Sequence, residues 1–134
     1  MPIETKTKVV IAEDDTVLAF MMDELCRSAG YDVVGCGSTA AETIALVDRH
    51  NPDIVILDFN LKGDRNGLEV ITEIRAGHPL IKTLLVTGWD INDIASRMNV
   101  DQPDRILRKP VLPQTLLSVM EQALATSPPI RSAL

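Results

Sequence analysis

The fold of this chain is decided by residues 53–58, DIVILD. Four consecutive apolar residues stand between its two aspartates, and such a run is typical of a central parallel strand that helices cover on both faces. Residues 8–12 and 82–86 are similar short runs and predict neighbouring strands. A chain organised around such strands is expected to fold as a parallel sheet between layers of helices.

The segments between these runs carry apolar residues at the three- and four-residue spacing of amphipathic helices. The expected strands are residues 8–12, 31–36, 54–57, 82–86 and 105–108. The expected helices begin near residues 15–16, 39–40, 68, 91 and 113. Five strands that alternate with five helices predict a doubly wound α/β fold.

One domain accounts for a length of 134 residues. We expect a polar leader over residues 1–7, the domain over 8–126 and a flexible tail over 127–134, with no output domain. A formal net charge of −6 argues against a nucleic-acid partner, because phosphate binding needs a basic patch. Without a signal-peptide pattern or an apolar run of the ~20 residues that span a bilayer, the chain is expected to be cytoplasmic, with no membrane partner. Cys26 and Cys36 lack metal-ligand spacing and are expected to be free, buried or half-buried thiols.

Four of the expected strands end at residues that can handle a phosphoryl group. These are the acidic cluster 13–15, Asp58, Thr87 and Lys109. Because the carboxyl ends of parallel strands lie at one edge of a sheet, we expect these side chains to converge there. Any one of them alone could be a helix cap or a residue at a loop boundary, but their joint arrangement favours a functional site.

Carboxylates that crowd together repel one another unless a cation neutralises them. Glu13, Asp14 and Asp58 are therefore candidate oxygen ligands of Mg²⁺. Lys109 would add a point charge and Thr87 a hydroxyl donor, so that Asp58 could act as a nucleophile and form an acyl phosphate. Asp15 is expected to cap the following helix instead.

These motifs together resemble the response-regulator receiver domain of bacterial two-component signalling, over about residues 7–126. The resemblance rests on residues 9–15, 53–58, 67–69, 86–88 and 109–110, whose order and spacing match together. It implies a flavodoxin-like (βα)5 fold with a five-stranded parallel sheet in the order 2-1-3-4-5. It also implies a switch that catalyses only its own phosphorylation and dephosphorylation.

The resemblance implies that Asp58 is the phosphoacceptor. Asp14 would bind Mg²⁺ directly, Glu13 mainly through water, and the backbone carbonyl of Asn60 would be a further ligand. The phosphoryl donor would be a histidine kinase or a histidine phosphotransfer domain. The protein would be a monomer or weak homodimer that acts on an unidentified downstream protein.

The expected switch departs from the family pattern. Thr87 would hydrogen-bond the phosphoryl group and shift, and Lys109, preceding a cis peptide to Pro110, would contact a phosphoryl oxygen. The family often has an aromatic residue where this chain has Ile106. Trp89 could replace that aromatic and, beside the path of attacking water, slow hydrolysis of the acyl phosphate. The loop after Asp58 is about one residue longer than is common.

Partner surfaces follow from the same resemblance. Phe20 on the first helix is a candidate contact for the phosphodonor domain. Leu117 and Leu124 widen the apolar face of the last helix and suggest an output or self-association surface.

The sequence leaves three alternative functions. A phosphohydrolase with an aspartate nucleophile typically needs a carboxylate two residues later, where this chain has Asn60. A flavodoxin-like cofactor carrier would need a phosphate-cradling loop after the first strand, where residues 13–15 would repel phosphate. A scaffold receiver that is never phosphorylated is the third, although it would not require the acids, Thr87 and Lys109.

Overall fold

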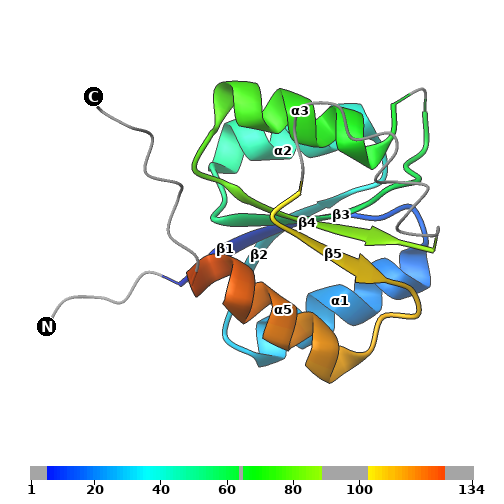
Figure 1. Cartoon of the computed structure of the whole chain (residues 1–134), viewed down its shortest axis with the longest axis vertical. Coiled ribbons are helices and arrows are strands. Elements are labelled where there is room, and N and C mark those ends of the chain that lie inside the picture. Colours follow the sequence, from blue (N-terminus) through cyan, green and yellow to red (C-terminus); the bar gives the residue numbers. More distant parts are fainter. Residues whose placement is uncertain (1–5, 64, 89–102, 126–134) are drawn as a thin grey trace, which may run out of the picture.

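A parallel sheet of five strands lies at the centre of the molecule, with helices on both faces (Figure 1). The computed structural model describes residues 6–63, 65–88 and 103–125. The strands are β1 Lys8–Ala12, β2 Asp32–Gly37, β3 Ile54–Asp58, β4 Lys82–Thr87 and β5 Arg105–Arg108. The helices are α1 Thr16–Ser28, α2 Ala40–His50, α3 Gly67–Gly77 and α5 Pro113–Ala125. The strand order is β2-β1-β3-β4-β5, as expected from the sequence.

The sheet separates two apolar cores. Helices α2 and α3 cover one face and α1 and α5 the other (Figure 1). Successive residues of β3 alternate between them: Val55 and Leu57 pack on the α2 and α3 side, and Ile54 and Ile56 on the α1 and α5 side. Since every residue of β3 is buried, the run that is apolar throughout is explained by two covered faces.

Local signals set the ends of the helices. Asp15 caps α1 through bonds from the backbone nitrogens of Val17 and Leu18, at 3.0 and 3.2 Å. The Thr39 hydroxyl accepts a bond from the backbone of Glu42 at the start of α2, while the Glu42 carboxylate accepts from the Ser38 hydroxyl. The expected capping box is therefore only half formed within the Thr39–Glu42 pair.

Several expected boundaries shift by one residue. Strand β2 is Asp32–Gly37 rather than 31–36, because Gly37 pairs with Ala12. Asp58 and Thr87 belong to their strands, since their backbones still pair with Val86 and Arg108.

Two further comparisons concern the cysteines and the expected fourth helix. Both cysteines are free and Cys26 is buried, but Cys36 is exposed because it lies on the edge strand β2. The expectation of two buried or half-buried thiols was thus wrong for Cys36.

The helix expected from about residue 91 lies outside the described residues. None of the helices that are described is long and apolar enough to cross a bilayer.

Candidate functional site

The carboxyl edge of the sheet brings together the side chains that the sequence singled out. Glu13 and Asp14 directly follow β1, Asp58 and Thr87 end β3 and β4, and Lys109 directly follows β5. The three strands that carry Asp58, Thr87 and Lys109 are hydrogen-bonded neighbours. Residues up to 96 positions apart in the sequence (Glu13 to Lys109, 109 − 13) therefore meet at one place because the strands are parallel.

Three carboxylates form the centre of this site. Glu13, Asp14 and Asp58 each offer one oxygen, and these atoms lie within 4.8 Å of one another. Glu13 and Asp58 are each only 4% exposed, whereas Asp14 is half-buried. Two buried carboxylates and a half-buried third therefore concentrate negative charge at this edge of the sheet.

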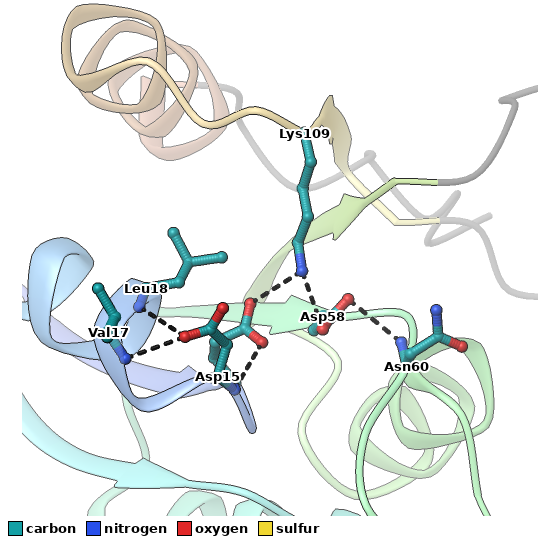
Figure 2. A network of polar contacts seen from close by, with 7 residues as sticks. Asp15, Val17, Leu18, Asp58, Asn60 and Lys109 are labelled. Atoms are coloured by element: carbon teal, nitrogen blue, oxygen red, sulfur yellow. Dashed lines mark hydrogen bonds and ion pairs between the residues drawn. The ribbon is translucent and has the colours of Figure 1, made fainter.

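Lys109 neutralises part of this charge. Its ammonium lies 3.2 Å from Oδ2 of Asp58 and 3.4 Å from Oε1 of Glu13. Figure 2 shows its side chain reaching Asp58 from one side while Asn60 approaches from another. Burial disfavours the charged form, but attraction to Asp58 and Glu13 outweighs burial and raises the pKa of Lys109. The lysine therefore stays charged beside the acids.

The single positive charge of Lys109 does not balance the three acids, and the pKa of Glu13 reflects its burial and the remaining negative charge. Burial, followed by the nearby Asp58 carboxyl, raises the pKa of Glu13 from 4.5 to about 7. A backbone bond from Asp15 to Oε2, 3.2 Å long, and the charge of Lys109 lower it only in part. Oε1 of Glu13 is buried and accepts no hydrogen bond. A buried oxygen of this kind is expected where a ligand outside the protein completes the pocket.

The donor set fits Mg²⁺. It consists of carboxylate oxygens alone, it is more negative than Lys109 can balance, and one buried oxygen has only the ion pair with Lys109 at 3.4 Å and no hydrogen bond. Asp15 is absent from this group of acids and serves as the helix cap, as expected. Asn60, whose backbone carbonyl is the expected further ligand, contacts Asp58 through its backbone nitrogen, which donates to Oδ1 of Asp58 at 3.2 Å (Figure 2).

The candidate switch residues are placed in part. Thr87 is fully buried, and its backbone carbonyl accepts a hydrogen bond from the backbone nitrogen of Lys109 at 2.8 Å. This bond joins the end of β4 to the residue whose ammonium contacts Asp58. Ile106 is half-buried and packs against the core on the α2 and α3 side. The Lys109–Pro110 peptide is cis, as expected. Trp89 lies outside the described residues.

The candidate partner residues differ in exposure. Phe20 is 66% exposed and lines a cavity of about 340 Å³ next to Glu13 and Asp14. Leu117 and Leu124 are half-buried and pack against the core between α5 and the sheet, so only part of each side chain is available to a partner.

Sequence reasoning missed how the loop after Asp58 is held. The backbone nitrogen of Lys62 donates to the carbonyl of Ser38 at 3.1 Å, which joins this loop to the loop after β2. Asn66 and Glu69 form a complete capping box at the start of α3, with both bonds at 3.0 Å. The Asn-x-x-Glu spacing was the available signal for that cap.

Known proteins similar to this chain identify its family. The family model described as "Response regulator receiver domain" matches residues 9–121. The chain therefore belongs to the response regulator receiver domain family, whose members are switches of two-component signalling systems.

Individual relatives include the transcriptional regulatory protein PdtaR of Mycobacterium tuberculosis. It is 28% identical over 118 residues, which cover 88% of this chain and 57% of PdtaR. The DNA-binding response regulator MtrA of Mycolicibacterium smegmatis is 30% identical over 84% of this chain and 48% of its own length. The chain thus spans about half the length of these curated relatives.

Solved structures share the fold over nearly the same residues. A CheY-like receiver domain protein from Methanospirillum hungatei superposes with a TM-score of 0.79 at 25% identity, covering 90% of this chain and 94% of that one. A LuxR-family DNA-binding response regulator from Staphylococcus aureus gives 0.80 at 28% identity, covering 88% and 98%.

Proposed function

We propose that this protein is a phosphoacceptor switch in which Asp58 receives a phosphoryl group in a Mg²⁺-dependent reaction. The donor is the phosphohistidine of a histidine kinase or of a histidine phosphotransfer domain. The observation that carries the proposal is the pairing of a nearly buried Asp58 with Lys109 at 3.2 Å inside a cluster of three carboxylates.

The chemistry that we propose is a displacement at phosphorus. A carboxylate oxygen of Asp58 forms the new O–P bond, the N–P bond of the donor breaks, and its electron pair stays on the imidazole, which takes up a proton. Lys109 stabilises negative charge on a phosphoryl oxygen, and the Thr87 hydroxyl donates to another. Mg²⁺, when bound by Glu13, Asp14, Asp58 and the Asn60 carbonyl, supplies further charge neutralisation at the phosphoryl oxygens.

Asn60 argues against a phosphohydrolase with many turnovers. A second carboxylate two residues after the nucleophile would activate water as a general base, and an amide cannot accept that proton. Acyl phosphate at Asp58 is therefore expected to persist long enough to act as a signal. The exposed Phe20 beside the acidic pocket supports docking of the donor on α1.

The response that we propose runs through Thr87 and Lys109, whose backbones are hydrogen-bonded to each other. Ile106 takes the place of the usual aromatic, and Trp89 is our candidate for its role. Leu117 and Leu124 are our candidates for a downstream or self-association surface. Free Cys26 and Cys36 fit a reducing compartment, and we place the reaction in the cytoplasm.

Intact mass spectrometry tests the proposal. The protein is incubated with Mg²⁺ and either acetyl phosphate or phosphoramidate, and it should gain the mass of one phosphoryl group. Asp58→Asn should abolish the gain, whereas Asp53→Asn, in the residue preceding β3 at its other end, should not. No gain with either donor would favour the scaffold alternative, and continuous phosphate release would favour the hydrolase.

A further inference from the structure

Gly67, the first residue of α3, lies against the backbone of the phosphoacceptor. A Cβ atom on Gly67 would lie 2.6 Å from the carbonyl oxygen of Asp58 and 3.0 Å from Cα of Phe59. It would also lie 3.0 Å from Cδ1 of Leu85. An approach of 2.6 Å to a backbone oxygen is closer than packed atoms come, so a methyl group here requires the backbone to move.

This contact is different from the other close glycine contacts in the chain. At Gly35 an added Cβ would meet the methyl end of Leu46 at 2.5 Å, and a side-chain end can rotate away. At Gly37 the nearest atoms are 3.2 Å away. Gly67 is the position where the obstructing atoms belong to the main chain at the reacting residue.

Neither side of the contact has room to retreat. The Asn66–Glu69 capping box fixes the start of α3, and buried Val70 and Ile71 hold the helix on the sheet. On the other side, the Phe59 nitrogen donates to the carbonyl of Val86 at 3.0 Å, which holds the peptide after Asp58 on β4. A hydrogen bond of 2.8 Å from the Gly67 nitrogen to the Phe59 carbonyl closes the contact.

The position of this peptide sets the orientation of the Asp58 carboxylate. Oδ1 accepts from the backbone nitrogen of Asn60, just beyond the Asp58–Phe59 peptide, and Oδ2 contacts Lys109. A shift of the peptide would move both Asp58 and the Asn60 nitrogen relative to Lys109, which is anchored on β5. Resting on the proposed phosphoacceptor function, we infer that Gly67 is a positioning residue. By leaving space for the Asp58–Phe59 peptide, it holds the Asp58 carboxylate in line with Lys109 and the acidic pocket.

The test compares Gly67→Ala with Gly77→Ala. Gly77 ends the same helix, and an added Cβ there meets nothing within 4 Å, so the two variants make the same chemical change at opposite ends of α3. Phosphorylation by phosphoramidate is followed by intact mass, Mg²⁺ affinity by calorimetry with the metal alone, and folding by thermal unfolding.

We expect Gly67→Ala to fold and to lower the maximal phosphorylation rate by about 10- to 100-fold, while the donor concentration at half-saturation changes little. Its Mg²⁺ affinity should fall by about 10-fold. Gly77→Ala should match the wild type in both.

Other outcomes overturn the inference. Wild-type rate and Mg²⁺ affinity in Gly67→Ala would show that the peptide tolerates the methyl group. Loss of folding in Gly67→Ala, and also in the Gly67→Ala/Gly77→Ala double variant, would show that Gly67 serves the fold as a whole. Recovery of the rate by adding Leu85→Val would assign the effect to core packing against Leu85. A wild-type protein that is never phosphorylated refutes the proposed function instead, and Mg²⁺ affinity then still tests the positioning role.

Discussion

Replacement of Glu13 by glutamine should remove a pH dependence from both folding and metal binding. In the wild type the pKa of Glu13 is raised from 4.5 to about 7 by burial and by Asp58. The folded protein therefore binds the Glu13 proton more tightly than the unfolded chain does. The free energy of unfolding should fall as pH rises from 4.5 to about 7, and it should level off above that range.

The magnitude follows from the size of the pKa change. From 4.5 to about 7 the ceiling is about 3 kcal/mol, at ~1.36 kcal/mol per pH unit. Because Asp58 and Lys109 readjust when Glu13 ionises, we expect about 2 kcal/mol of the loss to be observed. Glu13→Gln carries no proton to lose, so it should lack this part of the pH dependence.

Mg²⁺ binding should show the complementary effect. A carboxyl must be deprotonated to bind a cation, so the wild type should bind Mg²⁺ more weakly near pH 6 than near pH 8 and should release protons on binding. In Glu13→Gln the affinity should be lower at both values and less dependent on pH.

Urea unfolding without metal at about pH 5 and about pH 8 measures the stability part, and the difference between the two proteins cancels the shared titrating groups that Glu13 does not contact. Calorimetric Mg²⁺ titrations in buffers of different ionisation enthalpy measure the proton release. Equal pH dependence of stability in the two proteins would refute the reasoning, because Glu13 would then be no more protonated in the folded state than in the unfolded one.

Three further predictions separate capping, loop conformation and donor docking. Asp15→Ala should lower the free energy of unfolding by about 1 kcal/mol in urea, with little change in calorimetric Mg²⁺ affinity. Asp14→Ala should lower the Mg²⁺ affinity, with little change in the free energy of unfolding. A larger loss of Mg²⁺ affinity in the Asp15 variant would contradict this division. Gly63→Ala should cost about 1–2 kcal/mol in the same unfolding assay, because φ of +103° disfavours a side chain; Gly77→Ala is the control, and equal stabilities would disprove the strain. Phe20→Ala should slow phosphotransfer from a protein donor by about 10-fold while leaving the rate with acetyl phosphate unchanged, and equal slowing with both donors would exclude a docking role.

The sequence by itself determined the order of the elements and the chemistry of the site. Periodicity separates helices from strands without tertiary information, and the fully apolar run before Asp58 requires two covered faces. Once the strands are parallel, their ends must share one edge, so the juxtaposition of Glu13, Asp58 and Lys109 follows from the topology. Asp15 as a helix cap could be expected from local sequence, because its partners are its own neighbours in the chain.

Tertiary structure decided what depends on contacts between distant residues. The pKa of Glu13 depends on burial by surrounding elements and on the distance to Asp58, and neither quantity is encoded in residues 13–15 alone. The exposure of Cys36 depends on β2 being the edge strand. The contact at Gly67, which is too close to admit a methyl group, exists only because α3 packs against the peptide after Asp58. Local pattern thus specifies which groups reach the edge of the sheet, whereas their charge, exposure and alignment are set by packing between segments that lie far apart in the chain.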